Sequence, residues 1–135
     1  MEMPRIEITS DLEELPRLVD FIDGFVEEHA LPMKLGMQLQ LALEELATNV
    51  IQHGYGGKAG TIRLSLERDG ETVRAVLIDR APAYDPFATA APDLEAGIDE
   101  REIGGLGVHL VREMAETVDY ARCGDENHVM IAIRT

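Results

Sequence analysis

Apolar residues recur along this chain at two spacings, every second residue in some segments and every third or fourth in others. Arg5-Ile6-Glu7-Ile8 alternates and predicts a short first strand. A helix should follow and end near His29, because its apolar residues keep helical spacing. Ser10 and Glu13 fit a capping box at its start, where side chains satisfy free backbone amides. The helical positions are Leu15, Leu18, Val19, Ile22, Phe25 and Val26.

A second amphipathic helix is predicted between two helix breakers. Pro32 suits the first turn, because a helix does not need the amide hydrogen that proline lacks there. The helix should stop at Gly54, since the glycines of Gly54-Tyr55-Gly56-Gly57 supply the left-handed conformations of a helix end. Its apolar stripe consists of Leu35, Leu39, Leu43, Leu46 and Val50.

Two strands follow and form a hairpin. Thr61–Arg68 and Glu71–Asp79 both alternate, and Asp69-Gly70 between them is a strong turn signal. Val76 and Ile78 make the end of the second strand apolar on both faces, which indicates an inner strand.

The last part of the chain contains a long loop, a helix and a second hairpin. Ala81–Gly104 carries three prolines, and a loop of this length in a compact domain is usually functional or disordered. A third helix starts at the end of this loop and runs to about Glu116. Val118–Arg122 and Val129–Arg134 then form a closing hairpin around Gly124–Asn127.

The element order β-α-α-β-β-α-β-β predicts one domain over residues 1–135. We expect an α/β (α+β) two-layer sandwich. Its three helices should cover one face of a mixed, mostly antiparallel sheet of about five strands.

Charge narrows the functional classes. The chain has 12 Lys and Arg against 26 Asp and Glu, a formal charge of −14. No basic cluster could neutralise phosphates, so we expect neither nucleic acid nor an anionic membrane as partner. The acidity has two interpretations, solubility or an acidic face that docks a basic partner. The single cysteine, Cys123, and the lack of a long apolar stretch predict a cytoplasmic protein.

Three groups of residues could carry chemistry. Glu45, Asn49 and His53 repeat every four residues and form a polar stripe on the second helix. An amide oxygen can bind a divalent metal, and a carboxylate one turn earlier can accept a proton. The other interpretation of this stripe is a solvated helix flank.

Asp79 ends an inner strand, a common ligand position at which a carboxylate can accept from an exocyclic amine. It could equally begin a turn. Gly104-Gly105-Leu106-Gly107 precedes a helix, where amides can bind an anion, although many such turns are only hinges. The chain lacks the P-loop pattern, which excludes a P-loop nucleotidase.

Taken together, these residues resemble a known superfamily. Glu45–Tyr55 is similar to the N box of the Bergerat-fold ATPases, and its ending in His-Gly-Tyr resembles the anti-sigma factor serine/threonine kinases. Asp79–Phe87 looks like the first glycine box of that branch, with Ala81 where a glycine is usual. Gly104–Val111 looks like the second glycine box, and Asn127 in the tail also fits.

The resemblance implies a role for each box. Glu45 would be the general base, selected over Glu44 by its four-residue spacing to Asn49, which would ligate Mg²⁺. Asp79 would accept from the adenine amino group of ATP, and Ala81–Ile103 would form the lid. The amides of Gly105 and Gly107 would receive phosphate. The implied nucleotide contacts are Asn49, Asp79, Ala81, Gly104, Gly105, Leu106, Gly107 and Val108.

The resemblance also implies partners. Such kinases phosphorylate a serine of a small anti-sigma factor antagonist and sequester a sigma factor when the antagonist is not available; homodimers are usual. Few side chains are needed, because phosphoryl transfer depends mainly on positioning and charge stabilisation. A non-catalytic, ATP-gated binding module is the alternative. A histidine kinase catalytic domain is the least favoured, because the chain contains no sensor and no phospho-acceptor segment.

Overall fold

The structure is a computed structural model that describes residues 3–88 and 103–134, with the backbone alone for residues 103–106. The predicted element order is confirmed. The elements are β1 (Arg5–Thr9), α1 (Leu15–Glu28), α2 (Met33–Asn49), β2 (Thr61–Asp69), β3 (Thr72–Asp79), α3 (Ile103–Met114), β4 (Thr117–Cys123) and β5 (Glu126–Arg134). In the described ranges, every helix is too short or too polar to reach across a bilayer.

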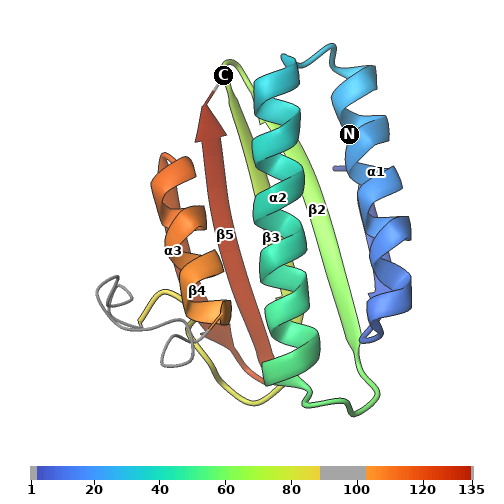
Figure 1. The fold of residues 1–135 in the computed structure, drawn as a ribbon, viewed down its shortest axis with the longest axis vertical. Coiled ribbons are helices and arrows are strands. Elements are labelled where there is room, and N and C mark those ends of the chain that lie inside the picture. The colour runs from blue at the N-terminus through green and yellow to red at the C-terminus, as the bar shows by residue number, and fades with distance from the viewer. Residues whose placement is uncertain (1–2, 89–102, 135) are drawn as a thin grey trace.

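The five strands form one sheet in the order β1-β2-β3-β5-β4, and the three helices lie on one face of it (Figure 1). The two-layer fold is therefore as predicted. All four strand pairings are antiparallel, however, so the expected mixture of pairings was wrong in this detail. β1, β3 and β4 run in one direction and β2 and β5 in the other, so no two neighbouring strands of this sheet are parallel.

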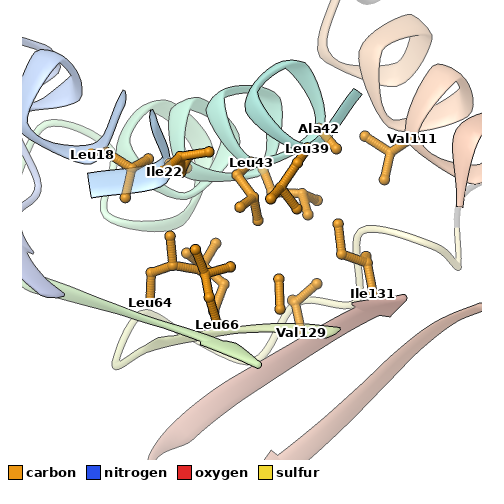
Figure 2. Packing of buried hydrophobic residues seen from close by; sticks show 14 of the residues in the cluster. Leu18, Ile22, Leu39, Ala42, Leu43, Leu64, Leu66, Val111, Val129 and Ile131 are labelled. Carbon is orange, nitrogen blue, oxygen red and sulfur yellow. The ribbon is translucent and has the colours of Figure 1, made fainter. Parts of the chain in front are cut away.

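The core lies between the helix layer and the sheet. In Figure 2, Leu18 and Ile22 of α1 and Leu39 and Leu43 of α2 point toward Leu64 of β2. All five side chains are almost fully buried. The helical stripes predicted from the sequence are therefore the faces that pack on the sheet. Burial of each such side chain contributes roughly 1.5–3 kcal/mol to folding, so α1 and α2 are held firmly on the sheet.

The start of the first helix differs from the prediction by one residue. Asp11, not Ser10, caps a 3₁₀ turn at Leu12–Glu14, because its side chain accepts from the amide of Glu13 at 2.9 Å. The hydroxyl of Ser10 donates instead to the carbonyl of Lys58 at 2.7 Å. Ser10 thus ties the first helix to the loop before β2, and the capping box proposed for it was wrong.

The second helix ends at Gly54 as predicted, but its last turn is wider than an α-helix. Val50–Gly54 is a π-helical turn, in which the amide of Tyr55 donates to the carbonyl of Val50 at 2.8 Å. Gly56 and Gly57 follow with φ values of 60° and 85°, which glycine adopts without strain. Turns of this kind are frequent at functional sites.

Candidate functional site

The N box and the first glycine box meet at a pocket between α2 and the ends of β3 and β5. Asn49 and Asp79, both predicted as site residues, line it. Its walls are otherwise mostly apolar. The lining residues are Leu46, Asn49, Val50, Gly54, Leu77, Asp79, Ala81, Pro82, Tyr84, Pro86, Asn127 and Val129. Apolar walls with a few convergent polar groups are typical of small-molecule sites.

The pocket is narrow in this conformation. Its cavity volume is about 20 Å³, which is room for about one water molecule. The pocket must therefore widen before a planar ring can enter, and Pro82, Tyr84 and Pro86 form one of its walls. That wall is the start of the predicted lid, Ala81–Ile103, of which residues 89–102 lie outside the described residues.

Asp79 is buried, with 3% of its surface exposed. Its Oδ1 accepts two hydrogen bonds, from the amide of Ala81 and from Nδ2 of Asn127, both at 2.9 Å. Within the described residues, no hydrogen bond to the other carboxylate oxygen is present, so that oxygen can accept from a ligand. The turn interpretation of Asp79 is therefore confirmed. Its place in the pocket lining is compatible with the ligand interpretation, which stays a prediction.

Ala81 fits its position although a glycine is usual there. Ala30 is the single non-glycine residue with a positive φ in the described ranges, so the backbone of Ala81 needs no conformation that disfavours a side chain. The methyl group of Ala81 lies against Gly54, where an added Cβ would be only 3.2 Å away. Because Gly54 has no side chain, the methyl group of Ala81 fits beside it in the lining of the pocket.

Asn127 is the main site residue that the sequence analysis misplaced. It was assigned to the turn of the closing hairpin, but that turn is only Gly124-Asp125, and Asn127 lies in β5 directly opposite Asp79. Its Nδ2 also donates to the carbonyls of Ala81 and Pro82, both at 3.1 Å. Counting back by twos from Val129 would have placed it on the buried face.

Side chains of β4 complete this network. Oδ1 of Asn127 accepts from the hydroxyl of Tyr120 at 2.5 Å and from Arg122 at 3.2 Å. Arg122 also donates to the carbonyl of Ala81 at 2.8 Å. Asn127 thus connects Asp79 and the start of the predicted lid to the closing hairpin. Tyr120 and Arg122 were not predicted as site residues.

Glu45 lies one helical turn before Asn49 and is half-buried. Burial raises the pKa of its carboxyl group, and the charge of His53 acts in the opposite direction. The side chain lies against Gly107 of α3, where an added Cβ would overlap the carboxyl group. The N box and the second glycine box are therefore in contact through Glu45 and Gly107.

The glycines of the second box form the beginning of α3 rather than a turn before it. Gly104 and Gly105 lie within its first four residues, whose amides have no partner inside a helix. Such amides and the helix dipole favour an anion. Val108 is buried in the core, so it supports the site and does not line the pocket. The side chain of Leu106 is outside the described residues.

Tyr55 forms hydrogen bonds that stabilise the backbone beside the pocket. Its hydroxyl donates to the carbonyl of Thr61 at 2.7 Å and accepts from the amide of Arg80 at 2.8 Å. Its ring covers Gly60, where an added Cβ would overlap ring atoms. Tyr55 therefore packs on Gly60 and links the ends of β2 and β3 through its two hydrogen bonds.

Gly60→Ala should therefore lower the free energy of unfolding by about 1–3 kcal/mol, because the ring must move and both hydrogen bonds weaken. Urea denaturation measures this. Gly24→Ala is the matched control, since nothing lies within 4 Å of the added methyl. Replacing this helix-interior glycine by alanine should raise the free energy of unfolding by roughly 0.5–1 kcal/mol. Equal effects of the two substitutions would contradict the packing of Tyr55 on Gly60.

Comparisons with known proteins bear on the family and the fold of this chain. The model of the family described as "Histidine kinase-like ATPase domain" matches residues 8–133. The serine/threonine-protein kinase BtrW of Bordetella bronchiseptica is 28% identical over 99 residues, which are 73% of this chain and 70% of that protein.

Two solved structures share the fold. One contains the RsbU and RsbW domains of Rv1364c from Mycobacterium tuberculosis, with a TM-score of 0.64 and 15% identity. The match covers 97% of this chain and 32% of that one, so this chain spans about a third of its length. The other is the histidine kinase AdeS of Acinetobacter baumannii, with a TM-score of 0.51, 15% identity and coverage of 99% and 68%.

Proposed function

The chain belongs to the histidine kinase-like ATPase domain family, and we propose that it binds MgATP and phosphorylates a serine of a small partner protein. In this proposal the chain is an anti-sigma-type serine/threonine kinase that also sequesters a sigma factor or a similar regulator. The similarity to a serine/threonine-protein kinase supports the reaction class. One observation carries the proposal: Asn49 and Asp79 line one pocket, and Glu45 lies one helical turn away against the start of α3.

The pocket has the chemistry for adenine. The oxygen of Asp79 that the turn leaves unused can accept from the amino group of the ring. Leu46, Leu77 and Val129 offer apolar surface to the ring faces. Because Asp79 is held by Ala81 and Asn127, its orientation is fixed before the ligand arrives. Such preorganisation lowers the entropic cost of binding.

The phosphates would lie between Asn49 and the start of α3. Asn49 is buried and offers a neutral oxygen ligand to a divalent ion. The amides at the beginning of α3 would receive the phosphate oxygens. MgATP, when bound, supplies the transferable phosphoryl group together with a cation that offsets its charge.

Glu45 is suited to act as the general base in this arrangement. Partial burial disfavours its charged form, which raises the pKa of the carboxyl group and makes the carboxylate a better proton acceptor. A serine hydroxyl presented at the pocket edge would give its proton to Glu45 as the phosphoryl group leaves ATP. Gly107 provides the space in which that carboxylate lies.

Thermal unfolding with and without MgATP tests the nucleotide site. A ligand at 100 times its dissociation constant adds about 2.7 kcal/mol to stability, which for a domain of this size raises the midpoint by roughly 5–10 °C. MgGTP should produce little shift, because guanine presents a carbonyl oxygen to Asp79 where adenine presents an amino group. Equal shifts with both nucleotides, or no shift with either, would contradict the assignment of Asp79.

A further inference from the structure

The solvent face of α2 carries large apolar side chains that the nucleotide pocket does not use. Met33, Met37 and Leu41 are 81%, 66% and 53% exposed. They follow one another every four residues, so they form a row along the helix. On α3, Leu110 is 47% exposed. Single exposed apolar residues are ordinary, but an aligned group of this size marks a surface that contacts another molecule.

Leu110 adjoins the row on α2. Gly107 of α3 contacts Glu45 of α2, and the two helices run side by side in opposite directions (Figure 1). Leu110, almost one turn after Gly107, therefore lies level with Leu41, one turn before Glu45. Met33, Met37, Leu41 and Leu110 are exposed on these two neighbouring helices and are here called the α2–α3 strip.

The helix on the other side of α2 is acidic. α1 lies beside α2 in Figure 1 and exposes Asp20, Asp23, Glu27 and Glu28. Arg17 is its single basic residue, and it pairs with Glu14 at 2.9 Å. In the part of the chain that the structure describes, the four α1 carboxylates form no ion pair. The helix beside the apolar α2–α3 strip is therefore negatively charged on its exposed side.

We propose that this surface binds an amphipathic helix of another protein, with its apolar side on the α2–α3 strip and its Lys or Arg residues beside α1. Apolar anchors at successive turns are the mode by which helices dock on helical surfaces. Methionine suits such a surface, because its flexible side chain adapts to the partner. The proposal does not depend on the nucleotide site.

Charge argues against a second copy of this chain as the occupant. The chain has a formal charge of −14, so a symmetric contact through this surface would bring two acidic helices together. Like charges across an interface are unfavourable, whereas a basic partner gains from the same field. The net charge had two interpretations, and one was an acidic face that docks a basic partner. In this proposal that face is the exposed side of α1.

A pair of designed peptides tests the proposal on the intact chain. Both are helices of about 18 residues, or five turns, with the same leucine face; one has lysine at every polar position and the other glutamate. Fluorescence anisotropy should show binding of the lysine peptide and none of the glutamate peptide. Met33→Ser combined with Met37→Ser should weaken binding at least about tenfold, since both anchors are lost without a change in charge.

Two further variants separate the parts of the surface. Met3→Ser removes a methionine that is 43% exposed outside the strip and should leave binding unchanged. Asp23→Asn combined with Glu27→Gln should weaken binding and reduce its salt dependence. The MgATP-dependent shift in unfolding temperature should survive in all variants, so loss of that shift would concern the proposed function and not this surface.

Several outcomes would overturn the inference. Unchanged binding in the double methionine variant would mean that charge alone attracts the peptide. Equal binding of the glutamate peptide would mean that the acidic helix plays no part. Absence of binding at millimolar peptide would remove the site altogether. Sedimentation that shows a dimer in the wild type and a monomer in the methionine variant would assign the strip to a second copy of this chain.

Discussion

Glu45→Gln is expected to reduce phosphoryl transfer by about 10²–10⁴-fold, the usual contribution of a positioned general base. Glutamine keeps the size of the side chain and its place against Gly107 but cannot accept the serine proton. MgATP affinity should stay within about threefold, because Glu45 lies beside the pocket and does not line it. The measurement is transfer of a labelled γ-phosphate to the partner protein, with calorimetry for affinity.

Glu44→Gln is the matched control, because it makes the same chemical change one residue earlier on α2. Its rate should equal that of the wild type. Gly107→Ala examines the same geometry from the other helix, since its methyl group would displace the Glu45 carboxyl group. Intact MgATP binding without transfer in the wild type itself would leave the non-catalytic binding module as the function.

The raised pKa of Glu45 gives this prediction a pH dependence. A base must be ionised, so transfer should fall on acidification at a pH above the ordinary glutamate pKa of about 4.3. The stability effect has the opposite sign. Because folding raises the pKa of Glu45, its protonated form contributes to the free energy of unfolding. This contribution is complete below the pKa of the unfolded chain and is lost as the pH rises through the pKa of the folded state. Glu45→Gln should therefore be no less stable than the wild type at neutral pH.

Much of this site could be predicted because its signals are local. Each signal lies within a few residues of sequence: the spacing of Glu45 and Asn49 on one helix, the carboxylate at the end of β3 and the glycines at the start of α3. The apolar stripes predict which faces become buried, and this brings the same residues to one end of the sheet. Local pattern is reliable here because burial of the Leu39 and Leu43 face allows one orientation of α2.

The parts that were missed depend on contacts between distant segments. Asn127 joins Asp79 only through the register of β5 against β3, and assigning it to the turn removed it from the buried face. The order of the strands, with β5 between β3 and β4, is likewise set by packing and not by any one segment. Ser10 was misassigned because Asp11 beside it offers the same kind of acceptor.

The network around Asn127 relates these missed residues to function. Asn127 donates to Asp79 and to two carbonyls of the segment that begins the lid, and Arg122 donates to one of the same carbonyls. The pocket must widen before adenine can enter, since the cavity has room for about one water molecule, and this segment forms part of its lining. In the proposed nucleotide site, the same hydrogen bonds would orient Asp79 toward adenine and restrain the segment that follows it.

Asp79→Asn is expected to reverse the nucleotide preference of the pocket. The amide oxygen of asparagine can still accept from Ala81 and Asn127, so the turn should survive. Its NH₂ group would then take the place of the oxygen that is free for a ligand, and two donors would face each other when adenine is bound. ATP binding should therefore weaken by about 10²-fold or more, because a charged hydrogen bond is lost and a donor is left without an acceptor.

Inosine triphosphate tests whether residue 79 contacts this position of the base, because its ring carries an oxygen where adenine has the amino group. It should bind Asp79→Asn better than ATP does, and the wild type worse; calorimetric titration of both nucleotides measures the two ratios. Asp85→Asn is the matched control. Asp85 forms a similar turn, accepting from the amide of Phe87 at 2.8 Å, but does not line the pocket, so its affinities should equal those of the wild type. Parallel losses for ATP and inosine triphosphate in Asp79→Asn would mean that Asp79 supports the fold and does not contact the base.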